Sequence, residues 1–475
     1  MRRVRIANIG TLLSSRRVQA LSAEIIDQLE RIVGRDGLVA PDAIAERATS
    51  YWDPSPMQGR VLVRPRSTTE VSAVLELCHA AGQPVVIQGG LTGPVEGAVG
   101  TPDDVLVSLE RMTAIESIDP TDGVAIVQAG AVLQKVQEDL AAEGFLFPLD
   151  LGARGSCTIG GTVATNAGGI NVLRYGMMRS LVLGLEAVMA DGTVVSSMQQ
   201  MLKNNSGYDL KQLFIGSEGT LGVVTRVAVR LFPMPQSRQT VMAAADSFDA
   251  VIAFLDRLKT GLAGTLSAYE VMWNNYYAGV TGEGGHRAPL GREHAFYVIA
   301  EAEGADPEAD AARFEKLLME AFESDLLVDA VVPKSDTERD ALWSVREGFD
   351  AVLPAYLYDV SLPIRNMTRY VERLNERLAA EWPGAVGYVF GHIADGNLHI
   401  FTVPHDGGEH RECSDDIVYG CLEGLDGSIS AEHGIGVEKR RWLSETKSAE
   451  ELAVMRSLKA TLDPRNILNP GKILS

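Results

Sequence analysis

The stretch that decides the fold runs from Pro148 to Gly169 and reads PLDLGARGSCTIGGTVATNAGG. Six of its residues are glycine, and most of the residues around them are small. Without a Cβ atom, a backbone can adopt positive φ and approach a flat ligand closely. Successive N–H groups in such turns form concavities that bind anions. Isolated glycines usually mark tight turns between strands, but this density favours a wall built for a large cofactor that carries phosphate.

Two later stretches complete the pattern. Residues 181–193 read LVLGLEAVMADGT, and residues 207–222 read GYDLKQLFIGSEGTLG. Together with the first stretch they resemble the FAD-binding domain of the vanillyl-alcohol oxidase/PCMH flavoprotein superfamily. Within it they resemble the D-2-hydroxyacid dehydrogenases, a branch that includes D-2-hydroxyglutarate, D-lactate and glycolate dehydrogenases. The chain contains no G-x-G-x-x-G, Walker A or G-x-S-x-G motif, so a Rossmann site, a P-loop and a nucleophile elbow have no support.

The resemblance runs from about residue 65 to the end of the sequence and implies an FAD site. It implies non-covalent FAD, because Thr158 stands where close relatives carry a histidine. Leu91 stands where the family usually has asparagine. The cofactor-binding residues that the resemblance implies are Gly89, Gly90, Leu91, Thr92, Gly93, Asp150, Gly155, Ser156, Ile159, Gly160, Gly161, Ala164, Thr165, Asn166, Gly168, Glu218, Gly222, Val223 and Asn469.

Composition limits the partners. The formal net charge is −20, from 63 acidic and 43 basic residues, which opposes binding to a nucleic-acid backbone. The four cysteines show no C-x-x-C spacing and are typical of a reduced, cytosolic protein. No run of 18 apolar residues occurs, so no membrane span is expected. The first 20 residues hold five arginines and weakly resemble a transit peptide, but a disordered or loosely packed N-terminus is the favoured interpretation. We expect the protein to be located in the cytoplasm of a bacterium or in the mitochondrial matrix of a eukaryote.

The local signals predict an α+β fold. Ser67–Glu70 is a capping box before a helix over 71–81, and residues 84–87 read as a buried strand. Asp191-Gly192 indicates a hairpin. The sequence FPMPQ at 232–236 is the best domain boundary. With the resemblance, we expect an N-terminal segment and helix (1–56), a PCMH-type FAD-binding domain (57–236) and an FAD-linked oxidase C-terminal, or cap, domain. The last of these (237–475) should combine an antiparallel sheet with helices, and its final helix should return to the FAD domain.

A histidine pair lies in the second domain, where residues 388–402 read YVFGHIADGNLHIFT. Asp395-Gly396 is a strong signal for a two-residue turn between two strands. That turn would place His392 opposite His399, with Cβ atoms roughly 4.5–5.5 Å apart. Two imidazoles so placed can share a metal ion. The alternative is a polar hairpin with two unrelated histidines.

A second motif, SAEHGIG at 430–436, supplies further polar side chains. The resemblance implies that His392, His399 and Glu432 bind a divalent metal, commonly zinc, and that His433 is the catalytic base and contacts substrate. Two histidines and one carboxylate leave open positions, as a catalytic metal site needs. Asn397 would point to the same face as His399 and contact substrate. The alternative for Glu432-His433 is a salt-bridged turn.

The resemblance implies that Arg346 binds the substrate carboxylate, and an arginine fork suits bidentate pairing with such a group. The alternative is a surface pair on a helix. Leu357 stands in the segment where diacid-specific relatives carry a lysine, and Asp350 replaces a small hydroxyl residue. We therefore expect D-lactate or a larger apolar D-2-hydroxy acid to rival D-2-hydroxyglutarate as a substrate.

The expected activity is FAD-dependent, metal-assisted oxidation of a D-2-hydroxy acid to the 2-oxo acid, with hydride passing to flavin N5. D-Lactate, D-malate and related acids are the candidate substrates. The expected partners are an electron acceptor, either an electron-transfer flavoprotein or a quinone or cytochrome, and a second copy of the chain in a homodimer. The alternatives are a flavoprotein transferase of the same fold, which should lack the histidine pair, and an oxidase subunit such as a glycolate oxidase component.

Overall fold

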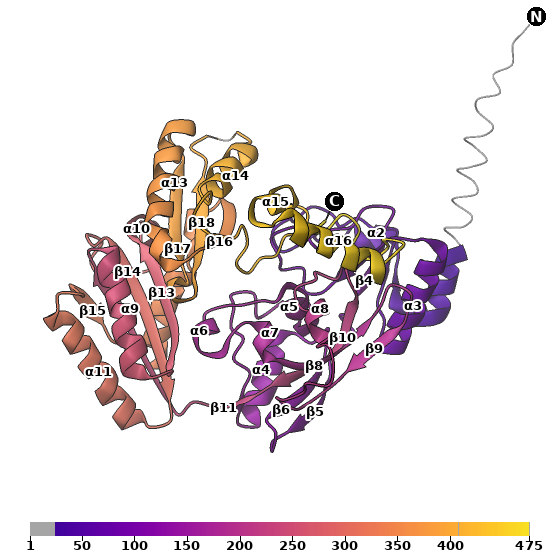
Figure 1. The fold of residues 1–475 in the computed structure, drawn as a ribbon, viewed down its shortest axis with the longest axis horizontal. Coiled ribbons are helices and arrows are strands. Elements are labelled where there is room, and N and C mark those ends of the chain that lie inside the picture. The colour runs from indigo at the N-terminus through magenta and orange to yellow at the C-terminus, as the bar shows by residue number, and fades with distance from the viewer. Residues whose placement is uncertain (1–23, 407, 475) are drawn as a thin grey trace, which may run out of the picture.

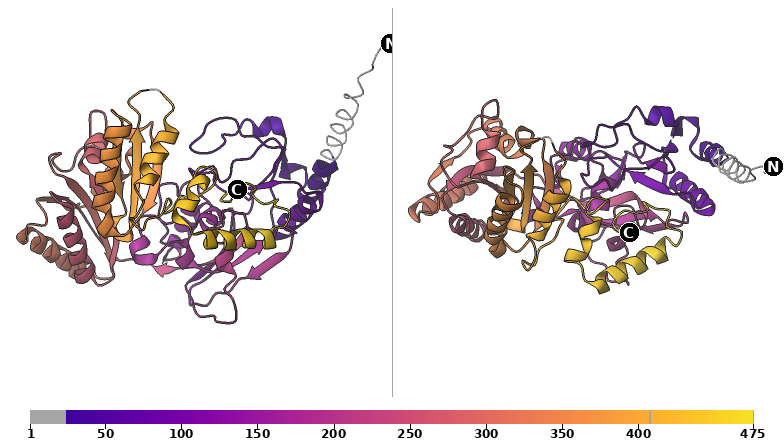
Figure 2. Two further views of the ribbon diagram at one scale, coloured as in Figure 1. Left: turned by 45° about the horizontal axis from the view of Figure 1, so that its top comes forward. Right: turned by 90° about the horizontal axis from the view of Figure 1, so that it is seen from above.

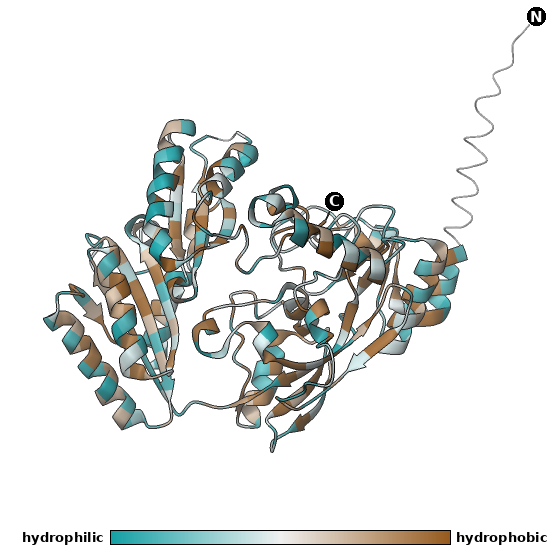
Figure 3. Ribbon diagram, viewed as in Figure 1, coloured by the Kyte–Doolittle hydropathy of each residue, from teal (hydrophilic) through white to brown (hydrophobic). Residues whose placement is uncertain are grey.

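The computed structural model describes residues 24–406 and 408–474, and its ribbon forms two halves (Figure 1). The arginine-rich segment at the start of the sequence lies outside the described residues. No helix among the described residues is long and apolar enough to cross a membrane. Apolar residues concentrate on the strands, and the outer faces of the helices are mostly hydrophilic (Figure 3).

The first half opens with a helix over 24–33 and a small sheet of order β1-β2-β4-β3. The strands β2, β4 and β3 run parallel and are mostly buried, as is usual when both faces of a parallel sheet are covered. As predicted, Ser67 caps a helix, α3, which ends at Gly82 with φ 64°. The elements are β1 (Leu38–Val39), α2 (Pro41–Ile44), β2 (Val61–Val63), α3 (Thr68–Ala81), β3 (Val85–Gln88) and β4 (Val105–Ser108).

A five-stranded antiparallel sheet of order β5-β6-β10-β8-β9 completes the first half. Val188 pairs with Val194, which confirms the predicted hairpin around Asp191-Gly192. The strands are β5 (Ile115–Asp119), β6 (Val124–Gln128), β8 (Val182–Val188), β9 (Val194–Ser197) and β10 (Val223–Arg230). The helices beside them are α4 (Leu133–Ala142), α5 (Ile159–Thr165), α6 (Val172–Tyr175), α7 (Met178–Leu181) and α8 (Lys211–Phe214). A short ribbon, β7 (Phe145–Leu146) with β11 (Phe232–Pro233), precedes the second half.

The second half is built on a seven-stranded antiparallel sheet of order β15-β12-β14-β13-β17-β18-β16. Alternate residues of its strands enter two cores: one against α9, α11, α13 and α14, the other against α10 and α12. The strands are β12 (Ser237–Ala245), β13 (Leu266–Trp273), β14 (Phe296–Gly304), β15 (Asp329–Val331), β16 (Tyr356–Ser361), β17 (Val386–Gly391) and β18 (Asn397–Val403). The helices are α9 (Phe248–Leu262), α10 (Asn274–Val280), α11 (Pro307–Glu323), α12 (Asp336–Glu347), α13 (Met367–Glu381) and α14 (Arg411–Gly420).

The end of the chain returns to the first half. After α15 (Leu443–Thr446), a capping box of Ser448 and Glu451 begins α16 (Ala449–Leu462). Figure 2 shows α16 lying along the half of the molecule that contains β8 and β10. Asn469 then accepts a hydrogen bond from the N–H of Ile87 and donates one to the carbonyl of Glu218. The C-terminal segment thus closes over the glycine-rich turns rather than over its own sheet.

The predicted turn between the paired histidines is wrong in register. β17 ends at Gly391, a 3₁₀ turn covers Ile393–Asp395, and β18 begins at Asn397. Phe390, not His392, is therefore the partner of His399 across the strands. The carbonyl of His392 accepts hydrogen bonds from the N–H groups of Asp395 and Asn397, so a helical turn takes up the residues that a two-residue hairpin would have paired. Gly396, with φ 93°, makes the return to β18 possible.

Candidate active site

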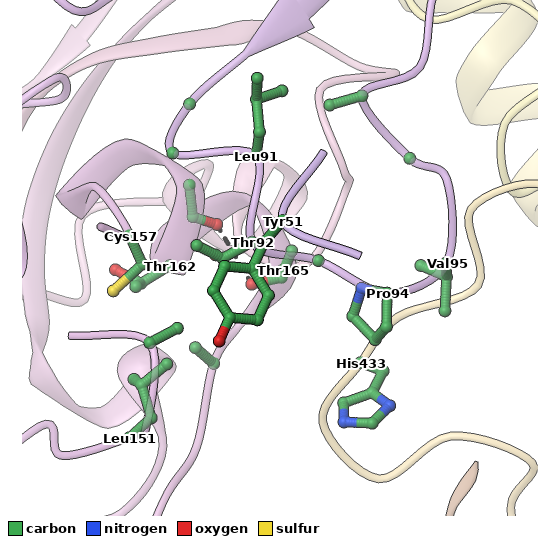
Figure 4. A pocket seen from close by; sticks show the side chains of 18 of the residues that line it. Tyr51, Leu91, Thr92, Pro94, Val95, Leu151, Cys157, Thr162, Thr165 and His433 are labelled. Carbon is green, nitrogen blue, oxygen red and sulfur yellow. Dashed lines mark hydrogen bonds between the residues drawn. The ribbon is translucent and has the colours of Figure 1, made fainter. Parts of the chain in front are cut away.

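A cavity of about 610 Å³ lies between the two halves, and residues of both line it. The first half contributes the two glycine-rich turns, and the second contributes side chains from β16, β17, β18, α12 and the loop at 430–436. Figure 4 shows small side chains such as Thr162 and Thr165 on one side of this cavity and His433 on a separate segment. The cavity thus has one wall of backbone and small residues and another that carries chemical groups.

The two glycine-rich turns, residues 89–93 and 152–169, form a glycine wall on one side of the cavity. This wall fits an FAD molecule because its backbone leaves no room for side chains. A Cβ on Gly90 would lie 2.1 Å from the carbonyl oxygen of Ser156, and one on Gly169, at φ 129°, would lie 1.8 Å from that of Asp150. The two turns therefore touch each other and leave small residues to face the cavity. Burial raises the pKa of the lining thiol Cys157 to about 12, so it is no nucleophile near neutral pH.

Most of the residues expected to bind FAD line this cavity. They are Gly89, Gly90, Leu91, Thr92, Gly93, Gly155, Ser156, Gly160, Gly161, Ala164, Thr165, Gly168, Glu218, Gly222, Val223 and Asn469. Three do not line it. Ile159 is fully buried in the core, Asn166 ends α5 and accepts a hydrogen bond from the N–H of Arg179, and Asp150 forms an ion pair with Arg154 at 2.9 Å.

The three expected metal ligands meet at one point. Ligand atoms of His392, His399 and Glu432 all lie within 4.8 Å of one another. The imidazole rings of the two histidines meet edge to face with centroids 5.1 Å apart, and His392 Nε2 lies 3.8 Å from Glu432 Oε1. The N–H of Gly169, from the glycine wall, donates to the same Glu432 oxygen at 3.0 Å. Two imidazoles and a carboxylate with open positions are a donor set that fits a catalytic zinc ion.

Glu270, on β13, contacts both His392 and Arg346 and holds their side chains in place. It is fully buried, and its carboxylate accepts a hydrogen bond from Arg346 Nε at 2.8 Å while its other oxygen contacts His392 Nδ1. A carboxylate on Nδ1 leaves Nε2 of His392 to a metal. Burial works to raise the pKa of Glu270, but the charges of His392 and Arg346 prevail and lower it to about 2. Burial likewise works to lower the pKa of His392, but Glu270 and Glu432 raise it to about 9.

Glu270 is not among the site residues predicted from the sequence. Its only local signal is an acidic residue within the otherwise apolar and small run LSAYEVMW. A buried acid almost always has a partner, and that rule would have directed attention to it.

Arg346 lies at the cavity wall and not on the surface. It is 7% exposed, and its guanidinium stacks over the ring of Phe390 at 4.6 Å. Nε is held by Glu270, and among the described residues Nη1 and Nη2 have no hydrogen-bond acceptor. Asp350, in contrast, is exposed and does not line the cavity. The arginine is thus positioned to receive an anionic group, and Asp350 does not oppose it there.

Two carboxylates, of which Asp359 is fully buried and Glu218 is partly buried, hold the loop that carries Glu432 and His433. Oδ2 of Asp359, on β16, accepts hydrogen bonds from the N–H groups of residues 431, 432 and 433 at 2.9, 2.6 and 2.9 Å. Its Oδ1 pairs with Lys439 and lies 3.0 Å from His433 Nδ1. Burial opposes the charge, yet His433 and Lys439 hold the pKa of Asp359 well below its usual range. Asp359, like Glu270, is not among the site residues predicted from the sequence.

The second of these carboxylates is Glu218, from the first half of the molecule. It accepts hydrogen bonds from the N–H groups of Ile435 and Gly436 at 2.7 and 2.8 Å. Burial raises its pKa, although these N–H groups oppose the rise. The loop is therefore fixed to the FAD-side wall at one end and to the seven-stranded sheet at the other.

His433 and Asn397 occupy different positions. The ring of His433 lines the cavity (Figure 4) and lies parallel to that of His399, with centroids 6.1 Å apart. Asn397 is 3% exposed and does not line the cavity. Neither polar atom of its side chain has a hydrogen-bond partner among the described residues. The structure thus brings together all the predicted site residues of the second half except Asn397.

The fold and the site define a two-domain flavoprotein whose second domain brings His392, His399 and Glu432 together at the cavity. Residues 59–197 match the family model of an FAD binding domain, and residues 234–473 match that of the C-terminal domain of FAD linked oxidases. The mitochondrial D-2-hydroxyglutarate dehydrogenase of Bos taurus is 39% identical over 96% of this chain and 84% of its own. That of Arabidopsis thaliana is 37% identical over 96% and 82%. The chain belongs to the FAD-linked oxidase family, in the branch of the D-2-hydroxyacid dehydrogenases.

Solved structures agree on the fold. p-Cresol methylhydroxylase with substrate bound superposes with a TM-score of 0.75 at 15% identity and covers 96% of this chain and 97% of its own. Alkyldihydroxyacetonephosphate synthase gives 0.72 at 16% identity, with coverage of 94% and 84%. At these identities the likeness shows the architecture alone.

Proposed function

We propose that the protein oxidises a D-2-hydroxy acid to the corresponding 2-oxo acid with FAD. The observation that carries this proposal is the convergence of Arg346, His433 and the group of His392, His399 and Glu432 on one cavity whose other wall fits FAD. When bound, FAD accepts the hydride from the substrate Cα at N5. The chain's own residues supply orientation and electrostatics.

Three residues would hold the divalent cation: His392, His399 and Glu432. Zinc fits this donor set, and its chemistry here would be that of a Lewis acid that lowers the pKa of the substrate hydroxyl. With the ion bound, Glu270 would accept a hydrogen bond from Nδ1 of His392 and leave Nε2 for the metal. The N–H of Gly169 fixes Glu432, so the metal site depends on both halves of the molecule.

His433 would remove the proton from the substrate hydroxyl. Its Nδ1 lies 3.0 Å from Asp359 Oδ1, although the pair does not have hydrogen-bond geometry, and Nε2 would be the proton acceptor. Arg346 would pair with the substrate carboxylate through Nη1 and Nη2, because its Nε is already held by Glu270. The two groups together place the substrate between the cap and the glycine wall.

The proposal extends to the surroundings of the enzyme. The substrate range includes D-lactate, D-malate and related acids, and FAD is non-covalent, a view supported by the high pKa of Cys157 and by Thr158, which caps α5. Re-oxidation would use an electron-transfer flavoprotein, a quinone or a cytochrome, and the chain would form a homodimer. A bacterial cytoplasm or a mitochondrial matrix is the proposed location, the latter in line with the names of several relatives.

Anaerobic reduction of the flavin tests this function. The FAD- and metal-loaded protein is mixed without oxygen with D- and L-enantiomers of several 2-hydroxy acids, and the flavin absorbance is followed. Bleaching by D-enantiomers alone is the expected result. If no 2-hydroxy acid bleaches the flavin while dithionite does, the proposal is wrong.

A further inference from the structure

The wall of the cavity beside His392, His399 and Glu432 changes from polar to apolar over two residues of β18. On β18, His399 and Phe401 point to the same face, and both line the cavity. Phe390 lies across from His399 on β17, and Leu357 lies across from Phe401 on β16. Residues two apart on a strand are separated by roughly 6.5–7 Å. The side chain of a substrate bound at His399 would therefore extend over Phe401 and Leu357.

The apolar wall continues from Phe390 and Phe401 to Phe349 and Trp52. The rings of Phe390 and Phe401 meet edge to face at 5.1 Å, and those of Phe401 and Phe349 do so at 5.8 Å. Trp52 lies 6.3 Å from Phe349, and its Nε1 donates to the carbonyl of Thr92 at 3.0 Å. The wall is thus fixed from both halves of the molecule, and it presents aromatic and aliphatic surface over its whole length.

Charge on the cavity wall opposes a second anion. Among the described residues that line the cavity, Arg346 is the only lysine or arginine, while Glu96, Glu218, Glu347 and Glu432 are all acidic. Arg346 is committed to one carboxylate by its place beside the metal cluster. A distal carboxylate that extends over Phe401 and Leu357 would have to leave water with no second lysine or arginine of the described lining to meet it, which is costly.

We infer that Leu357, Phe401, Phe349 and Trp52 form the subsite for the substrate side chain, and that the preferred substrates are D-2-hydroxy acids with apolar side chains. This inference rests on the proposed function, because Arg346 and the metal ligands set the orientation of the substrate. Branched aliphatic and aromatic side chains suit the wall best. Each methylene buried against it should raise kcat/KM about fourfold until the subsite is full.

The wild-type protein provides the first test. We would measure kcat/KM for D-lactate, D-2-hydroxybutyrate, D-2-hydroxy-4-methylpentanoate, D-2-hydroxyglutarate and D-2-hydroxy-5-methylhexanoate. In the last of these an isopropyl group replaces the distal carboxylate of D-2-hydroxyglutarate at similar size. The values of kcat/KM should rise along the series of apolar side chains. The value for D-2-hydroxy-5-methylhexanoate, whose side chain is uncharged, should exceed that for the diacid by about tenfold or more, the value of one charge-assisted hydrogen bond. A tenfold preference for D-2-hydroxyglutarate would overturn the inference.

Two substitutions give the second test. Leu357→Lys should raise kcat/KM for D-2-hydroxyglutarate relative to D-2-hydroxybutyrate by about tenfold or more, and Val386→Lys, at an exposed position of the same sheet, should not. Phe401→Ala should lower kcat/KM for D-2-hydroxy-4-methylpentanoate about tenfold or more, because the substrate side chain loses apolar contact area. The change for D-lactate, whose side chain is a single methyl group, should be less than about threefold. The assignment of these residues would be overturned if each variant kept its FAD and left unchanged the ratio of kcat/KM between its two substrates.

Failure of this inference can be told from failure of the proposed function. If D-2-hydroxy acids bleach the flavin but the diacid is preferred, only the apolar subsite is wrong. If no 2-hydroxy acid bleaches it, both are wrong.

Discussion

The substitution Glu270→Gln tests how the buried carboxylate organises the site. Glu270 is fully buried and contacts both His392 and Arg346. Glutamine has nearly the same size and shape, so the change removes the charge and leaves the packing. Any loss of stability can then be assigned to electrostatics rather than to a cavity.

The magnitude follows from the pKa of Glu270, which falls from the ordinary value of 4.5 to about 2 in the folded protein. The rise in the pKa of His392 to about 9 is the same interaction seen from the other side and is counted once. A depressed carboxyl pKa stabilises the fold above the unfolded value, and this contribution is lost as the pH falls toward the folded value. For metal-free protein it amounts to roughly 3 kcal/mol at pH 7 and roughly 2 kcal/mol at pH 3.5.

Urea unfolding of the metal-free wild type and variant at these two pH values measures the contribution. The free energy of unfolding should differ by about 3 kcal/mol at pH 7, and the difference should shrink by about 1 kcal/mol at pH 3.5. Glu315→Gln, at an exposed position on α11, serves as the control and should change neither value. A difference that is independent of pH, or smaller than about 0.5 kcal/mol, would refute the electrostatic reasoning.

Three further outcomes are expected. His433→Ala should slow flavin reduction by roughly 10²–10⁴-fold with FAD content unchanged, while His405→Ala, at an exposed position, should not; a change in KM alone would make His433 a binding residue. Thorough chelation should abolish turnover, and zinc, manganese or cobalt should restore part of it; full activity in a variant with both His392→Ala and His399→Ala would exclude the metal site. Acid precipitation of the yellow protein should release FAD into the supernatant, and flavin that stays in the pellet would show a covalent bond.

Short-range signals predicted the local structure well. The serine that caps α3, the capping box of α16 and the hairpin at Asp191-Gly192 each depend on residues within a few positions of one another. The glycine wall could also be predicted, because its glycines lie close together in the sequence and mark positions where the backbone has no room for a side chain.

Long-range partners could not be predicted in the same way. Glu270 and Asp359 contact histidines that lie far along the chain, and nothing in their own neighbourhood names these partners. The histidine pair was identified from residue type, but its register was wrong because a 3₁₀ turn at 393–395 lengthens the loop. His392 and His399 still meet, with ring centroids 5.1 Å apart.

The most direct test of the account is a single anaerobic turnover of the FAD- and zinc-loaded protein with D-2-hydroxy-4-methylpentanoate. The account predicts that the flavin is bleached completely, that one 2-oxo acid forms for each flavin reduced, and that the L-enantiomer and the metal-stripped protein give neither signal. Bleaching by the L-enantiomer at an equal rate, or flavin that stays oxidised with every D-2-hydroxy acid, would contradict it.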